Sequence, residues 1–92
     1  MPQTISIIVK GKVQGVFYRQ TTKEKARQFG ITGTVCNLPD SSVKIMATGE
    51  KIQLDKLLDW CRQGPPRAAV SGVEFNEETL VHFPDFRVVR GD

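Results

Sequence analysis

The sequence predicts an α+β fold in which two helices cover one face of an antiparallel or mixed sheet. Three observations lead to this prediction. Several short segments alternate apolar and polar residues with the period of two that is typical of strands. Two longer segments carry apolar residues at helical spacing. Finally, 92 residues with 39% hydrophobic and 25% charged side chains suit a single folded domain.

The first strand and the first helix are predicted at residues 4–11 and 18–29. In the strand, Ile5, Ile7 and Val9 share one face. In the helix, one stripe is expected to face the core, and it consists of Tyr18, Thr22, Ala26 and Phe29. The polar residues of the same segment are expected to face water, and these are Lys23, Glu24, Arg27 and Gln28. Gly30 stands where a left-handed C-terminal cap is expected.

The remaining elements complete the order β-α-β-β-α-β, followed by a short strand. Residues 31–38 and 42–48 read as strands joined by the turn Pro39-Asp40-Ser41. A second helix is indicated by the spacing of Leu54, Leu57, Leu58 and Cys61. Gly64-Pro65-Pro66 ends that helix, because proline cannot continue it. The last strands are expected at 70–75 and, at a sheet edge, 86–89. This order predicts one ferredoxin-like two-layer sandwich over residues 1–92.

Charge and composition narrow the class of partner. The net charge of +3 favours an anionic partner, but the 13 lysines and arginines are dispersed and not clustered as in nucleic-acid-binding proteins. A small anionic ligand fits this charge better. No apolar run is long enough to span a membrane, and no secretory signal is visible, so we expect a cytoplasmic protein. We expect Cys36 and Cys61 to be buried and reduced, with a disulfide between them as the alternative.

Familiar catalytic and metal sites are not apparent. The acidic residues are scattered, and nothing resembles a metal-binding arrangement, so no metal or cofactor is expected. We expect the single histidine, His82, to be exposed to solvent. Cys61 and Arg67 have the spacing of a cysteine-phosphatase loop, but such a loop joins a strand to a helix, whereas Cys61 ends a helix. Pro65 and Pro66 also remove two N–H donors, so this match is a coincidence.

Residues 11–19 join the first strand to the first helix and are the most informative stretch. Gly11 and Gly15 allow the backbone to curl, so that the N–H groups from Gln14 to Arg19 converge on one point. Such a nest at a helix N-terminus binds an anion, and the guanidinium of Arg19 matches phosphate oxygens. The alternative is a tight turn whose arginine is merely solvated. The sequence has neither the P-loop spacing nor GxGxxG, so nucleotide binding is unsupported.

The same stretch, Gly-Lys-Val-Gln-Gly-Val-Phe-Tyr-Arg, resembles the acylphosphatase signature at every position. The family's second motif, G-x-V-x-N-x-x-D-G-[ST]-V, matches residues 33–43 except at Ser41, where the family usually has glycine. If that position needs a positive φ, serine costs about 1 kcal/mol of backbone strain. The resemblance extends over the whole chain and implies a five-stranded ferredoxin-like fold.

The resemblance also implies a reaction and its residues. It implies that the protein hydrolyses small acyl phosphates to a carboxylate and inorganic phosphate without a metal. We expect the protein to be a monomer. Asn37 would position the attacking water, and Arg19 would bind the substrate phosphate together with a backbone loop. That loop comprises Gln14, Gly15, Val16, Phe17, Tyr18 and Arg19. The alternative is a non-catalytic RNA- or phosphoprotein-binding module, but the first and third strands carry no aromatic residue on which bases could stack. Whether carbamoyl phosphate or a phosphorylated protein side chain is the substrate stays open.

Overall fold

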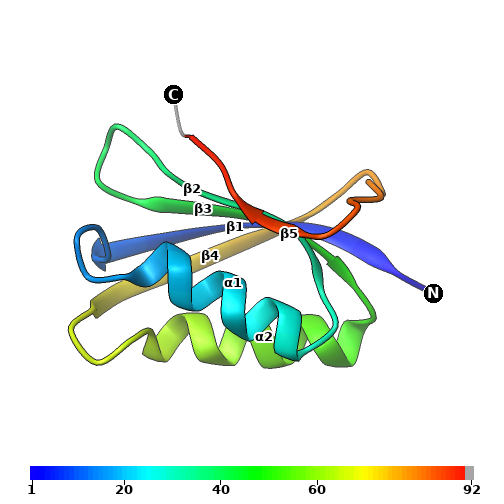
Figure 1. The fold of residues 1–92 in the computed structure, drawn as a ribbon, viewed down its shortest axis with the longest axis horizontal. Coiled ribbons are helices and arrows are strands. Elements are labelled where there is room, and N and C mark those ends of the chain that lie inside the picture. The colour runs from blue at the N-terminus through cyan, green and yellow to red at the C-terminus, as the bar shows by residue number, and fades with distance from the viewer. Residues whose placement is uncertain (91–92) are drawn as a thin grey trace.

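The computed structural model describes residues 1–90, in which two helices pack side by side against one face of a five-stranded sheet (Figure 1). The elements in chain order are β1 (Gln3–Lys12), α1 (Tyr18–Gln28), β2 (Thr32–Asn37), β3 (Val43–Gly49), α2 (Lys51–Gln63), β4 (Ala69–Glu78) and β5 (Phe86–Val88). The predicted α+β, ferredoxin-like architecture is therefore confirmed.

The strands lie in the order β4-β1-β3-β2-β5. β1 pairs antiparallel with β3 and β4, and β2 pairs antiparallel with β3. β5 pairs parallel with β2, so the sheet is mixed, and the last strand lies at an edge as predicted. This edge pairing places β5 beside α1 (Figure 1).

β4 is longer than its sequence indicates, because it ends at Glu78, whereas the alternation in the sequence stops at Phe75. The reason is long-range pairing: β4 follows β1 as far as the partners Thr4 and Glu78. The hydroxyl of Ser6 also donates a 2.7 Å hydrogen bond to the Glu78 carboxylate. Backbone pairing of this kind leaves no periodic signal in a polar segment.

The core lies between the sheet and the helices. The faces of β1 and β3 that were predicted to be apolar are buried, and so is the stripe of α2 that consists of Leu54, Leu57, Leu58 and Cys61. Both cysteines are free, so the alternative of a disulfide is not realised. The expectation that both are buried is wrong for Cys36, which is only half-buried. Its neighbour Val35 points into the core, and successive side chains of a strand point to opposite faces.

The loop between β1 and α1 and the turn between β2 and β3 lie at the same end of the sheet (Figure 1). The fold therefore brings the two sequence motifs, which are about twenty residues apart, next to each other. Neither described helix is long and apolar enough to cross a membrane.

Candidate active site

The loop that leads into α1 has an unusual backbone. Gly15 and Phe17 both have positive φ, at 74° and 64°. A residue in the left-handed conformation next to residues in the right-handed conformation turns successive N–H groups toward one side, which forms an anion-binding concavity. Phe17 is the N-cap of α1, and its side chain is 73% exposed. Glycine would adopt this conformation without strain, so a phenylalanine here indicates that the loop is held by its surroundings.

The N-terminus of α1 has no cap from its own sequence. Its first turn contains no acidic residue, and no side chain in the described part of the chain caps it with a hydrogen bond. Within residues 1–90, no hydrogen bond uses the backbone N–H groups of residues 14–20 as donors. By contrast, α2 begins with a complete capping box between Glu50 and Gln53. The first N–H groups of α1 therefore point to an anion-binding site, because the helix dipole adds positive potential there.

A cavity of about 570 Å³ lies at this helix terminus and brings the two motifs together. It is lined from the loop by Gly15, Phe17, Tyr18 and Arg19 and from the end of β2 by Asn37. Arg19, in the first turn of α1, is exposed and forms no ion pair within 4.0 Å in the described part of the chain. The two residues assigned to phosphate and water thus share one cavity.

The other two residues of the predicted loop, Gln14 and Val16, do not line the cavity. The Val16 side chain is buried in the core. The side-chain NH₂ group of Gln14 donates two hydrogen bonds of 2.9 Å, to the backbone carbonyls of Leu38 and Ser42. Gln14 therefore ties the loop to the turn beside Asn37, a role that the spacing of the motif did not indicate.

The β2–β3 turn is itself held by local contacts. The carboxylate of Asp40 accepts hydrogen bonds from the backbone N–H and the hydroxyl of Ser42. These bonds lower the pKa of Asp40 below its usual value. Ser41 has φ of 76°, so the backbone strain expected for serine at this position is present.

Asn37 contains the only buried side-chain oxygen or nitrogen atom in residues 1–90 that lacks a hydrogen-bond partner. This atom is its side-chain oxygen. An unsatisfied buried acceptor costs about 1–3 kcal/mol. Such a cost is typical of a group that is retained for a function rather than for stability.

Three cations in the cavity wall were not predicted as site residues: Lys23 and Arg27 from α1, and Arg87 from β5. The sequence indicated only that Lys23 and Arg27 face water. Lys23 and Arg27 follow Arg19 by four and eight residues, which places all three on the same side of the helix, and this spacing could have identified them from the sequence. Arg87 reaches the cavity wall because β5 pairs parallel with β2, and no sequence pattern near residue 87 indicated this pairing.

Cys61 lies in α2, where the order of elements placed it, and not in a loop that joins a strand to a helix. It is fully buried near the end of α2, and burial raises the pKa of its thiol to about 12. The phenol of Tyr18 donates a 2.8 Å hydrogen bond to the Cys61 carbonyl, and its ring lies 5.2 Å from that of Trp60. Tyr18 therefore anchors the first turn of α1 to α2. His82 is exposed, as expected.

Comparisons with known proteins agree with the two motifs. Residues 5–88 match the family model described as Acylphosphatase. A protein named Acylphosphatase from Acaryochloris marina is 49% identical over 92 residues, which cover 98% of this chain and 99% of the relative. The structure of an acylphosphatase from Coxiella burnetii superimposes with a TM-score of 0.93 at 41% identity, and covers 96% of this chain and 93% of its own.

A second solved structure, the acylphosphatase from Bacillus subtilis, has a TM-score of 0.92 at 30% identity and covers 97% of this chain and 99% of its own. Both the sequence and the fold are thus shared over nearly the full length. The chain belongs to the acylphosphatase family and is an enzyme of that family.

Proposed function

We propose that residues 1–92 act as a single acylphosphatase domain that hydrolyses small acyl phosphates to a carboxylate and inorganic phosphate without a metal. The observation that carries this proposal is that Arg19 and Asn37 line one cavity at the uncapped N-terminus of α1. Family membership supports the reaction class. The assignment of individual residues rests on the geometry and on the chemistry of each side chain.

In this mechanism the phosphoryl group lies against the N-terminus of α1. The backbone N–H groups of residues 14–19 donate to its oxygens, and the Arg19 guanidinium adds a charged two-pronged contact. Phosphoryl transfer needs mainly positioning and stabilisation of charge on the equatorial oxygens. Both demands are met by donors that no other hydrogen bond in the described residues occupies.

Asn37 orients the attacking water. Its side-chain oxygen has no partner, and the terminal torsion of asparagine turns over a broad range. A small rotation lets this oxygen accept a hydrogen bond from water. An amide suits this role, because it orients water without repelling the anionic phosphoryl group.

The leaving group explains why no acid or base residue is needed. Water forms a new P–O bond while the bond between phosphorus and the acyl oxygen breaks. The departing carboxylate has a conjugate acid with a pKa of roughly 4, so it leaves without protonation. The proton of the water passes to a phosphate oxygen of the substrate. The products are then a carboxylate and inorganic phosphate.

Two substitutions separate the proposed roles, with benzoyl phosphate as substrate and inorganic phosphate as the binding probe. We expect Arg19→Ala to lose both phosphate binding and hydrolysis, and Asn37→Ala to lose hydrolysis while phosphate binding is largely retained. Arg67→Ala and Asn76→Ala are matched controls, since both residues are exposed and lie outside the cavity. Full activity of Asn37→Ala would contradict the mechanism, in which Asn37 orients the attacking water. Loss of activity in EDTA that added metal restores would contradict the absence of a metal.

The expected partners are thus a small acyl phosphate and inorganic phosphate, with no nucleic acid or membrane. A cytoplasmic location and a monomeric state stay predictions from the sequence. Light scattering on the purified chain tests the second of these.

A further inference from the structure

One side of α1 carries a row of cations that begins at the proposed phosphate site. Arg19, Lys23 and Arg27 are four residues apart, so they lie on the same side of the helix, with about 6 Å between successive positions. All three line the cavity that also contains Asn37. The row therefore leads along the cavity wall, away from the phosphate.

The far end of this row is held in place by β5. The Arg27 guanidinium donates a 3.0 Å hydrogen bond to the backbone carbonyl of Phe86. The neighbouring Arg87 also lines the cavity, and its side chain is oriented by a 2.7 Å ion pair with Asp85. Among residues 1–90, no acidic residue lines this cavity. Two of the cations are thus fixed before any ligand binds, which lowers the entropy lost on binding.

The four-residue spacing of this row does not stabilise α1. Like charges four residues apart repel each other, and Lys23 has such a neighbour on both sides. Glu24 is the only acidic residue of α1, and none of the row forms an ion pair within 4.0 Å in residues 1–90.

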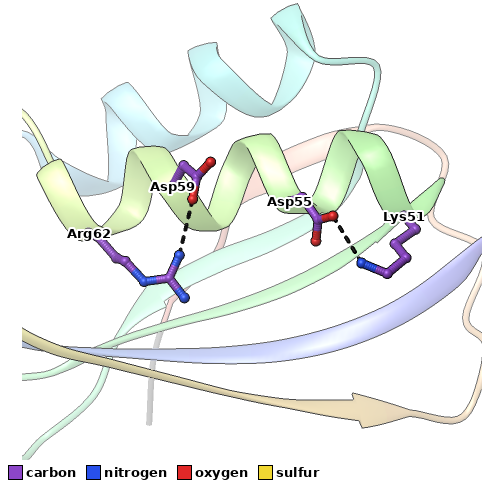
Figure 2. A network of polar contacts seen from close by, with 4 residues as sticks. All are labelled: Lys51, Asp55, Asp59 and Arg62. Atoms are coloured by element: carbon purple, nitrogen blue, oxygen red, sulfur yellow. Dashed lines mark hydrogen bonds and ion pairs between the residues drawn. The ribbon is translucent and has the colours of Figure 1, made fainter.

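The second helix shows the opposite arrangement. On α2, Lys51 pairs with Asp55 at 3.0 Å and Arg62 pairs with Asp59 at 3.2 Å (Figure 2). Four of the five charged side chains of α2 are thus paired within the helix, whereas those that line the cavity on α1 form no ion pair in residues 1–90. The unbalanced charge faces a cavity whose volume lies in the range of small-molecule sites.

We propose that Lys23 and Arg27, with Arg87, form a second anion subsite, and that the preferred substrates are acyl phosphates whose acyl group carries another negative charge. This proposal rests on the proposed function, since it assigns Arg19 to the phosphoryl group. The second charge, a carboxylate or a phosphate, would lie about one to two helical turns, roughly 6–12 Å, from the first. Lys23 is the residue that determines this preference, because it is the member of the second subsite that is nearest to Arg19 along α1.

Hydrolysis of a matched pair of substrates tests the preference. Glutaryl phosphate and pentanoyl phosphate have acyl chains of the same number of carbons, and only the first ends in a carboxylate. We expect the wild-type kcat/KM to be higher for glutaryl phosphate, and Lys23→Gln to lower the ratio of the two values about two- to fivefold. Lys23→Glu should lower the ratio further and still fold, because it replaces repulsion by attraction to Arg19 and Arg27. Lys56→Gln, an exposed cation of α2 outside the cavity, should leave both values unchanged.

Binding of non-hydrolysable analogues separates this proposal from the proposed function. Calorimetry compares the affinities of three phosphonates. Pentylphosphonate carries no other anionic group, 5-phosphonopentanoate also carries a carboxylate, and the third probe carries a second phosphonate in place of that carboxylate. Tighter binding of the probes with a second anionic group to wild type but not to Lys23→Glu supports the subsite even if neither acyl phosphate is hydrolysed. Equal binding of probes with and without the second anionic group, or a kcat/KM ratio that Lys23→Gln does not change, overturns it.

Discussion

Gln14 offers the sharpest test of how the site is assembled, because its side chain joins the two motifs without lining the cavity. In Gln14→Ala, two hydrogen bonds of 2.9 Å to the carbonyls of Leu38 and Ser42 are lost. Each carbonyl keeps another donor, the N–H of Ser41 at 3.2 Å and that of Leu38 at 2.9 Å, so neither is left unsatisfied. The loss is then two net hydrogen bonds, or about 1–3 kcal/mol of the free energy of unfolding.

Urea denaturation measures this loss, and the melting temperature should fall by about 4–8 °C for each kcal/mol in a domain of this size. With benzoyl phosphate, kcat should fall about tenfold or more, because the loop and Asn37 no longer keep their relative positions. The affinity for inorganic phosphate should change much less, since its proposed ligands all lie within the loop. Gln28→Ala is the control, because this glutamine lies at an exposed position of α1 and its side chain forms no hydrogen bond within the described residues.

Gln14→Glu sharpens the comparison. It keeps the length of the side chain but places a carboxylate next to two carbonyl oxygens, which repel it and to which it donates no hydrogen bond. The losses of stability and of kcat should therefore equal or exceed those of Gln14→Ala. A wild-type kcat in both variants would refute the positioning role, even if their stability falls. If the free energy of unfolding is also unchanged in both variants, the two hydrogen bonds of Gln14 contribute nothing to stability.

Three other predictions concern stability. Tyr18→Phe removes the buried bond to the Cys61 carbonyl and should cost about 1–3 kcal/mol in urea denaturation; an unchanged midpoint would show that the bond contributes nothing. Ser41→Gly should stabilise the chain by about 0.5–1 kcal/mol, because relief of left-handed strain exceeds the added entropy of the unfolded state; destabilisation would mean that the serine side chain contributes to the turn. The lowered pKa of Asp40 means that its contribution to stability is complete above its unfolded value of 3.8 and is lost as the pH falls through the folded value. Asp40→Asn should therefore flatten the acid limb of the stability profile below about pH 5, and a profile identical to that of wild type would contradict this account.

The fold could be predicted because its signals are local. Alternation in β1 and β3 identifies strands whose observed ends lie within one residue of the expected bounds. The apolar stripe predicted for the second helix lies inside α2 and is buried, as expected. The end of β4 could not be predicted, because pairing with β1 rather than its own pattern extends it to Glu78. The parallel pairing of β5 with β2 is likewise a property of the assembled sheet.

The candidate site was predictable to the extent that it follows a motif. Arg19 and Asn37 are fixed positions of the two motifs, and the structure places both in one cavity. The part played by the Gln14 side chain depends on a contact with residues 24 and 28 positions away, which spacing along the chain does not reveal. Arg87 lies in the cavity only because β5 lies beside α1.

The missing cap of α1 links catalysis to folding. A helix whose first N–H groups have no partner is less stable than one that its own sequence caps, and a bound phosphate supplies that partner. Any anion that binds only the native chain shifts the folding equilibrium by RT ln(1 + [L]/Kd), about 2.7 kcal/mol at a hundredfold excess over Kd. We therefore expect that substrate and product, bound at this terminus as proposed, protect the chain from unfolding and proteolysis, so that the survival of the enzyme would follow the supply of these compounds.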